Sequence, residues 1–206
     1  MEDVLETYAL PYDPEIPLIC MDEKPFYFVV DEIDPIAMSS NHPRLEDYSY
    51  RCVGSCSVFM FVESLRGWRH VEAQERRTKF DWARQIERLL LEFYPKAKKV
   101  RLVMDNLNTH VLGSLYDVFC AEKARSLARR LEIHYTPKHG SWLNVAECEL
   151  SALSRQCLDR RIPNIEVLNT QLVTWEKDRN NSVKQVNWHF TAEQARGKLK
   201  YLYPNL

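Results

Sequence analysis

The stretch Asp105–His110 combines a carboxylate, two amides and an imidazole within a few residues. It follows Val100–Met104, a short apolar run that is typical of a buried strand. A second apolar run, Leu18–Met21, leads in the same way into Asp22. Ligands and reactive groups gather beyond the carboxyl ends of strands in open α/β sheets. Two aspartates at strand ends therefore make a metal-dependent site the first hypothesis.

A third carboxylate lies in the segment Lys138–Glu147, where a glycine-containing loop feeds a helix that Asn144 opens. If the two strands are neighbours and this helix packs over their ends, Asp22, Asp105 and Glu147 converge. Three carboxylates repel one another unless cations hold them, and the hard cations Mg²⁺ and Mn²⁺ take oxygen ligands. Two such ions can activate a nucleophilic water and stabilise the leaving 3′ oxygen in phosphodiester cleavage.

The remaining sequence supplies the elements that must position these acids. Strands are predicted at 18–22, 51–63, 67–72, 100–104 and 131–135. Apolar residues at helical spacing predict helices at 78–94, 115–130, 144–157 and 163–175, with a last short helix that Thr191 caps. Residues 31–48 are polar and are predicted to form a loop. This order indicates one mixed α/β domain with a helical C-terminal layer.

Composition limits the class of protein. A chain of 206 residues with 45% hydrophobic residues can bury a full core as one domain. No apolar run approaches the roughly 20 residues that span a bilayer. Residues 1–10 lack the basic and apolar regions of a signal peptide, so we expect a cytoplasmic protein. The six cysteines form no C-x-x-C pair and no zinc-site spacing with histidine.

The formal net charge of −1 hides an asymmetry. Residues 1–47 contain 12 acidic and 2 basic side chains, whereas residues 48–206 contain 17 acidic and 26 basic ones. The second part is mildly basic and could face a polyanion, although it has no dense lysine or arginine tract. Residues 1–17, which are acidic and contain three prolines, are predicted to be a lead-in segment before a domain at 18–206.

Long motifs carry a resemblance to a known family, the catalytic domain of bacterial insertion-sequence transposases. The branch is the "IS six-thirty" group, which is related to the mariner transposases. The motifs follow one another in the order of that family and span nearly the whole chain. The matching segments are Cys20–Pro25, Gly67–Val71, Val103–His110, Tyr135–Glu147, Leu153–Pro163 and Trp188–Thr191.

The resemblance implies an RNase H-like mixed sheet flanked by helices and a DDE active site. By motif, Asp22 is the first acid, Asp105 the second and Glu147 the third. In that family the acids hold two metal ions, Mg²⁺ or Mn²⁺, that drive DNA strand cleavage and strand transfer at transposon ends. The implied setting is the bacterial cytoplasm, associated with the nucleoid.

Family members usually place helix-turn-helix DNA-binding modules before the catalytic domain. This chain starts about twenty residues before the first acid. The resemblance therefore leads us to expect a catalytic fragment, one product of a split reading frame, or a remnant. The expected partners are transposon-end and target DNA, and a second copy or a partner chain that carries the helix-turn-helix modules.

Other interpretations of these residues remain open. Asn144 and Glu147 have the spacing of a capping box, which is compatible with metal binding. Glu23 follows Asp22 immediately, so in a strand it points to the opposite face. Glu149 lies on another side of the helix from Glu147. Glu23 and Glu149 are therefore rival acids, and we expect each to be structural or solvated.

The residues around the acids have less specific roles. Asn106, Asn108 and His110 could contact DNA phosphates, orient metal-bound water or cap a turn. Lys138 and His139 could contact DNA phosphate or remain solvated loop charges. Two alternatives to a transposase also remain, an RNase H-like nuclease that cleaves without joining and an inactive remnant that acts as an interaction module.

Overall fold

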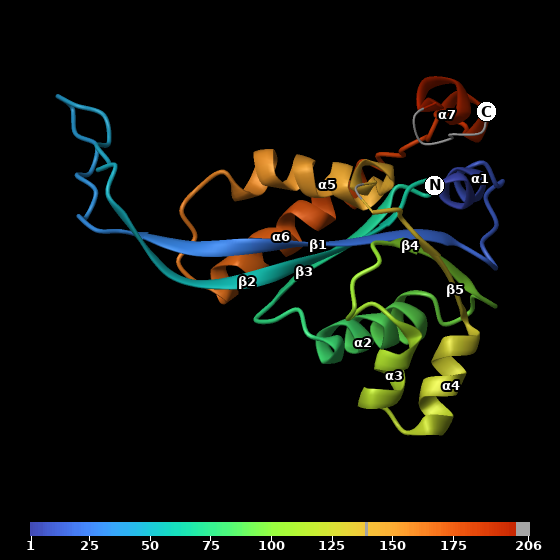
Figure 1. The fold of residues 1–206 in the computed structure, drawn as a ribbon. Coiled ribbons are helices and arrows are strands. Elements are labelled where there is room, and N and C mark those ends of the chain that lie inside the picture. Colours follow the sequence, from blue (N-terminus) through green and yellow to red (C-terminus); the bar gives the residue numbers. More distant parts are fainter. Residues whose placement is uncertain (139, 201–206) are drawn as a thin grey trace.

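The structure is a computed structural model that describes residues 1–138 and 140–200. Its strands are β1 (Leu18–Asp31), β2 (Tyr50–Glu63), β3 (Trp68–Gln74), β4 (Val100–Met104) and β5 (Leu131–Tyr135). They form one mixed sheet with the order β3-β2-β1-β4-β5 (Figure 1). β1, β2 and β3 pair antiparallel, whereas β4 runs parallel to both β1 and β5. The predicted mixed sheet is therefore confirmed.

Helices cover both faces of this sheet. They are α1 (Glu2–Tyr8), α2 (Lys79–Arg88), α3 (Leu112–Val118), α4 (Ala121–Arg129), α5 (Val145–Leu153), α6 (Ile165–Asn181) and α7 (Ala192–Lys198). π-helical turns extend α2 (η1, Leu89–Phe93) and α5 (η3, Ser154–Leu158), and a 3-10 turn precedes α5 (η2, Ser141–Leu143). None of the helices in the described chain is both long enough and apolar enough to span a membrane.

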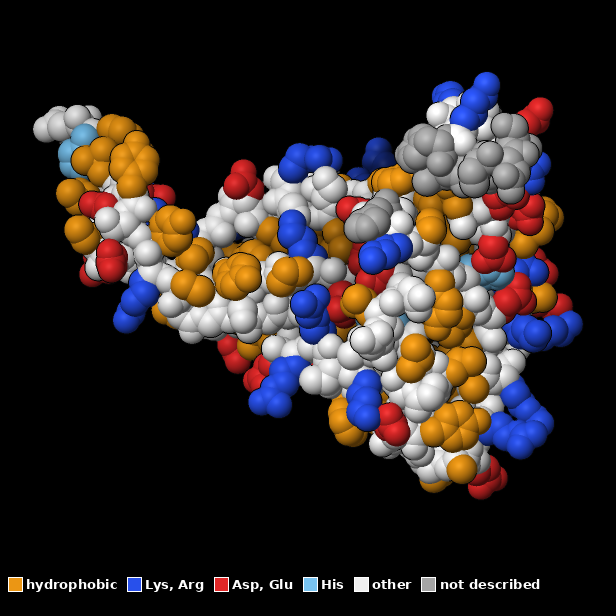
Figure 2. All heavy atoms as spheres, viewed as in Figure 1, with side chains coloured by type: hydrophobic (Ala, Val, Ile, Leu, Met, Phe, Trp, Pro, Cys, Tyr) orange, Lys and Arg blue, Asp and Glu red, His pale blue; other side chains and the backbone are white. Residues whose placement is uncertain are grey.

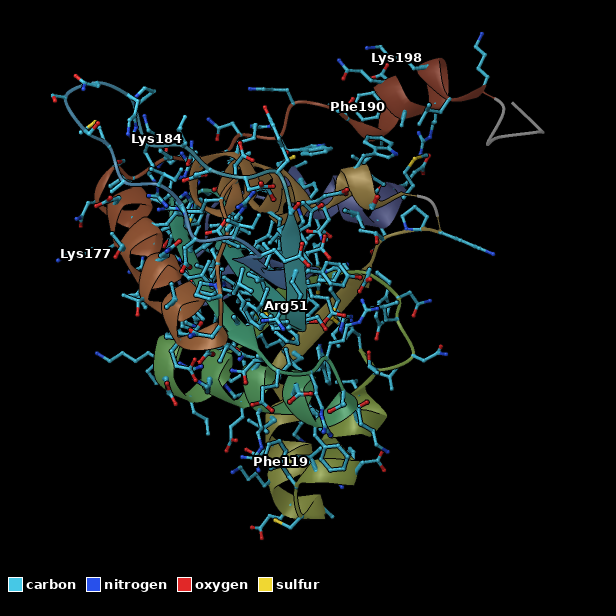
Figure 3. All side chains as sticks on the ribbon, turned by 90° about the vertical axis from the view of Figure 1, so that its left-hand side faces the viewer. Arg51, Phe119, Lys177, Lys184, Phe190 and Lys198 are labelled. Atoms are coloured by element: carbon cyan, nitrogen blue, oxygen red, sulfur yellow. The ribbon has the colours of Figure 1, made fainter. Side chains whose placement is uncertain are left out.

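The two helical layers enclose two apolar cores. α2, η1, α3 and α4 pack on one face of the sheet, and α1, α5, α6 and α7 pack on the other. In Figure 3 the two layers lie on opposite sides, with Phe119 at the end of α3 below and Phe190 before α7 above. The sheet therefore separates the two cores and gives every strand two faces with different neighbours.

Alternation along β1 decides which core each of its side chains enters. Ile19 and Met21 are fully buried in the core under α2, whereas Cys20 is fully buried in the core under α5. The same alternation directs Asp22 toward the α5 layer and Glu23 toward the α2 layer. Neighbouring acids on one strand therefore enter different environments.

β1 is longer than the sequence predicted, and this corrects the position of Asp22. The predicted strand ended at Asp22, but β1 continues to Asp31. It pairs with the parallel strand β4 only as far as Cys20, yet it keeps its antiparallel partner β2 up to the pair Asp31–Tyr50. Hydrogen bonding to one neighbour is enough to extend a strand. Asp22 therefore lies inside a strand, and only Asp105 follows a strand end.

The outer halves of β1 and β2 form a hairpin arm, residues 26–56, that extends from the body of the domain (Figure 1). In Figure 3 this arm comes toward the viewer, and Arg51 lies on it. The connection between the two strands contains only the isolated bridges Ile36–Leu45 and Ser39–His42 among the described residues. The loop predicted at residues 31–48 is confirmed.

Local signals for helix starts are also confirmed. The Thr78 side chain and the Asp81 backbone and carboxylate form a capping box at the start of α2. Thr191 and Gln194 form the same arrangement at α7. Gly67, the first residue of the strand predicted at 67–72, lies instead in the turn before β3. Its φ of 72° is one that glycine adopts without the cost of a Cβ clash.

The lead-in segment contributes a helix to the core. Val4 and Leu5 of α1 are buried in the core under α5. The Tyr8 hydroxyl donates a hydrogen bond of 2.7 Å to the carbonyl oxygen of Leu143, just before α5. The N-terminal helix therefore supports the start of α5, while the domain boundary at residue 17 stays a prediction.

A buried ion-pair network joins β3, α5 and α6. The fully buried Arg69 of β3 donates to both carboxylate oxygens of Glu149 in α5, at 2.8 and 2.9 Å. Arg179 of α6 donates to the same carboxylate at 3.0 Å. Burial favours a raised pKa for Glu149, but the two guanidinium groups hold that pKa below its ordinary value. Because three elements share one carboxylate, the network fixes α5 against the sheet.

We predict that Glu149→Gln lowers the free energy of unfolding by about 3–5 kcal/mol, because it leaves buried guanidinium charge without its partner. Urea denaturation followed by circular dichroism measures this change. Asp117→Asn is the control, because it removes an exposed ion pair with Lys79 and should cost less than about 1 kcal/mol. Equal stability of the two variants would contradict the role of the network.

Candidate active site

The parallel pairing of β1 and β4 places Asp22 beside Asp105. The last paired residues of these strands are Cys20 and Val103, and each aspartate lies two positions further along the chain. Two positions are one full period of a strand, so Asp22 faces the layer that contains α5, whereas Asp105 directly follows the end of β4 at Met104. The pairing of β1 with β4 therefore brings the backbones of the two aspartates to neighbouring positions.

The electrostatics of Asp22 show how close the acids are. Burial raises the pKa of Asp22 to about 7. The negative charges of Asp105 and Glu147 add to this increase, and Glu23 adds a smaller contribution. The N–H of Glu23 opposes the increase by donating to Asp22 Oδ1 at 2.8 Å. Asp105 and Glu147 therefore both lie within electrostatic reach of Asp22.

Asn144 holds the first turn of α5 next to Asp22. Its side-chain amide donates to the carbonyl oxygen of Met21 in β1 at 2.8 Å. Its side-chain oxygen accepts the N–H of Ala146 at 3.1 Å and caps the helix. Because one buried side chain binds both the strand and the helix start, Glu147 is fixed over the strand that carries Asp22.

The capping box considered for Glu147 is not formed. Asn144 accepts from Ala146, one residue before the position that a capping box requires. The backbone N–H of Asn144 donates to the carbonyl oxygen of Ser141 at 2.7 Å. Glu147 is exposed, so its carboxylate is free of this structural role and accessible to a ligand.

The two rival acids, Glu23 and Glu149, lie against basic side chains. Glu149 is bound by Arg69 and Arg179 in the network described above. Glu23 lies in the α2 layer, where its side chain is only 3% exposed. Its nearest charged neighbours are His110 and Arg77, at 3.6 and 3.5 Å. Neither carboxylate faces the surface that Asp22 and Asp105 share.

His110 is buried rather than available to DNA. Its side chain is 1% exposed, and its Nδ1–H donates to Asp105 Oδ1 at 2.6 Å. Burial favours a lower pKa for His110, but contacts with Asp105 and Glu23 outweigh it and raise that pKa to about 9. The His110 side chain is therefore inaccessible to a DNA phosphate in this arrangement, and its part in the site stays a prediction. The sequence did not lead us to predict the contact between His110 and Glu23. The alternation of side chains along β1, which turns Glu23 toward the α2 layer, is the pattern that indicates it.

Two of the other predicted residues, Asn106 and Lys138, line a pocket of about 490 Å³. Asn106, Asn108 and Lys138 are exposed, and His139 lies outside the described residues. In Figure 2, Lys and Arg side chains lie close to Asp and Glu side chains in the region between α5 and α2. The pocket is lined by Asp105, Asn106, Leu107, Thr136, Pro137, Lys138 and Ser141.

The acids offer oxygen ligands for a hard cation. Within residues 1–138 and 140–200, no three His, Cys, Asp or Glu side chains are gathered closely enough to hold a metal ion as they stand. Burial, and to a smaller degree the neighbouring charges of Asp105 and Glu147, nevertheless disfavour a negative charge on Asp22 and raise its pKa. A divalent cation would relieve this repulsion, and carboxylate oxygens are the ligands that Mg²⁺ and Mn²⁺ prefer. The donor set therefore fits such an ion.

Comparison with solved structures shows the fold. The chain is similar to "Crystal structure of the Mos1 mariner paired end complex with Mn", with a TM-score of 0.58 and 16% identity over 88% of this chain and 54% of that one. For the Mos1 strand transfer complex the TM-score is 0.56, at 15% identity over 87% and 54% of the two chains. For the Mos1 paired-end complex with the left transposon end it is 0.54, at 14% identity over 89% and 58%.

These likenesses confirm the predicted RNase H-like fold, a mixed five-stranded sheet flanked by helices. The chain spans about half the length of the chains in these structures. No curated protein sequence matches it. One family matches residues 17–169, a range that includes all three predicted acids, and its description is "DDE superfamily endonuclease". Because that match covers most of the chain, the protein belongs to the DDE superfamily endonuclease family.

Proposed function

We propose that this protein is the catalytic domain of a transposase that cleaves DNA at transposon ends and joins the new 3′ end to target DNA. The placement of the acids carries the proposal. Asp22 lies in β1, and Asp105 directly follows β4, the parallel neighbour of β1. Glu147 lies in the first turn of the helix that covers them. The motif segments favour the bacterial "IS six-thirty" branch of insertion sequences.

Asp22, Asp105 and Glu147 would hold two metal ions, Mg²⁺ or Mn²⁺. Two such ions supply activation of a water or 3′-hydroxyl nucleophile and stabilisation of the leaving oxygen. The protein would supply the negative carboxylates and hold them in position. Asn144 holds the helix that carries Glu147 against β1, and the exposed Lys138 beside Asp105 can bind a DNA phosphate.

DNA and a divalent cation are the partner and the cofactor that we propose for this chain. The family description supports a nuclease or transposase, and the similar Mos1 structures are a paired-end complex with Mn and a strand transfer complex. We extend DNA as the partner and a divalent cation as the cofactor to this chain. End recognition by a homodimer, or with a partner chain that carries helix-turn-helix modules, and action at the bacterial nucleoid belong to the same proposal.

The product of the reaction separates the proposal from its alternatives. Joined DNA molecules in the presence of target DNA support a transposase. DNA that is nicked but never joined indicates an RNase H-like nuclease. No product from the chain, even with a helix-turn-helix module attached, indicates an inactive remnant that serves as an interaction module.

We predict that Mn²⁺ raises the melting temperature of the metal-free protein, because a ligand that binds only the folded state stabilises it by mass action. At a hundred times the dissociation constant the gain is about 2.7 kcal/mol. Asp105→Asn should abolish this gain, whereas Asp117→Asn, a change to an exposed aspartate in α3, should keep it. An undiminished gain in Asp105→Asn would place the ion elsewhere.

We predict that Glu147→Gln lowers DNA cleavage by several orders of magnitude, because a misplaced ion loses both its nucleophile-activating and its leaving-group roles. The assay uses the chain joined to a helix-turn-helix module, so that weak DNA binding does not limit the rate. Glu166→Gln, at an exposed glutamate in the first turn of α6, is the matched control and should cleave normally. Normal cleavage by Glu147→Gln would reject this residue as the third acid.

We predict that the chain alone binds DNA weakly, without sequence preference, and loses binding as the salt concentration rises. Lys138→Ala should reduce the slope of log K against log salt by about 1 if this lysine contacts a phosphate. Lys123→Ala is the control, because Lys123 lies in α4 on the other side of the sheet and pairs with Glu87. Tight binding to one short duplex over scrambled DNA would contradict the prediction.

A further inference from the structure

We infer that Glu23 and His110 are positioning residues that fix the carboxylate of Asp105 for cation binding. The inference rests on the proposed function, because it assigns these two residues to the same site. Neither would touch DNA or a metal ion, since both side chains lie in the α2 layer and are almost fully buried. Their effect would pass through Asp105, which His110 contacts directly.

His110 is held in one orientation before it meets Asp105. Its ring stacks on the fully buried Trp82, with the centroids 6.0 Å apart and the planes 26° from parallel. Its carbonyl oxygen accepts a hydrogen bond of 2.9 Å from the Tyr135 hydroxyl. The Nδ1–H of this fixed ring then donates to Asp105 Oδ1 at 2.6 Å. One carboxylate oxygen of Asp105 is therefore bound by protein, which leaves Oδ2 for a cation.

Glu23 completes the arrangement on the far side of the ring. Its Oε2 lies 3.6 Å from His110 Nε2, and neither carboxylate oxygen of Glu23 has a hydrogen-bond partner in the described part of the chain. A buried carboxylate without hydrogen bonds is costly unless an opposite charge compensates it. The guanidinium of Arg77, 3.5 Å from Oε1, supplies that charge, and the His110 ring lies against Oε2. Glu23 thereby holds the ring toward Asp105.

Glu23 also contacts Asp22, the first of the three predicted acids. The backbone N–H of Glu23 donates to Asp22 Oδ1 at 2.8 Å. Glu23 therefore orients Asp22 through its main chain, and Asp105 through its side chain and His110. Both aspartates keep a second oxygen for a ligand. Hydrogen-bonded partners of this kind orient metal-ligating side chains and change metal affinity by about 10–100-fold when they are mutated.

Binding of Mn²⁺ to the metal-free protein, followed by the electron paramagnetic resonance signal of free Mn²⁺, tests the inference. His110→Phe keeps the ring on Trp82 but removes both N–H groups, so it should weaken binding at least about tenfold. His110→Asn keeps a donor near the position of Nδ1 and should recover part of that loss. Glu23→Gln should also weaken binding, because the ring loses its compensating charge.

Glu63→Gln is the matched control. Glu63 is a buried carboxylate on the same face of the sheet and accepts a hydrogen bond from Tyr94 at 2.7 Å. In the part of the chain that the structure describes, it makes no hydrogen bond or ion pair with Asp22, Asp105 or Glu147. This variant should lose stability but bind Mn²⁺ as the wild type does. If it weakens binding as much as Glu23→Gln, the effect is a general loss of packing and the inference is overturned.

The outcomes separate this inference from the proposed function. Wild-type protein that binds no Mn²⁺ overturns both. Loss of binding in Asp105→Asn with unchanged binding in His110→Phe overturns only the positioning role. Nuclear magnetic resonance of the metal-free protein adds a readout without metal, because the Nδ1 proton of His110 should be protected from solvent exchange in the wild type and in Glu63→Gln. Equal protection in Glu23→Gln overturns the part assigned to Glu23.

Discussion

Repulsion among carboxylates is the constraint on which the rest of this structure depends. Asp22 is held beside Asp105, because it lies inside β1 and that strand pairs with β2 from Cys20 to Asp31. Its pKa is raised to about 7 by burial and by the acids around it. Like charges at close range destabilise each other most where water is excluded. The folded backbone therefore holds together groups that a divalent cation would stabilise.

The elements that carry the acids are fixed from several directions. Asn144 joins the start of α5 to β1, and Tyr8 of α1 supports the same turn. Arg69 holds the middle of α5 through Glu149. Under the sheet, His110 holds Asp105. Stability gained in the α5 network and in the two cores offsets the cost of a site whose charges repel one another.

Local sequence patterns were sufficient for much of the fold. Capping residues such as Thr78 and the apolar spacing of α2 depend on neighbours a few positions away, and the structure confirms both. The extension of β1 beyond Asp22 could not be predicted in this way, because it depends on pairing with a strand that follows a long connection. The burial of His110 against Glu23 likewise needs the loop after β4 to fold under a distant strand. Alternation along β1 did predict that Glu23 faces away from Asp22.

Anomalous X-ray scattering at the manganese absorption edge, from crystals soaked in MnCl₂, tests the central claim most directly. The account predicts two manganese peaks whose nearest protein atoms are carboxylate oxygens of Asp22, Asp105 and Glu147, at distances of about 2.1 Å as for similar hard cations. Peaks bound only by other residues, or a site without manganese at saturating concentration, would contradict it.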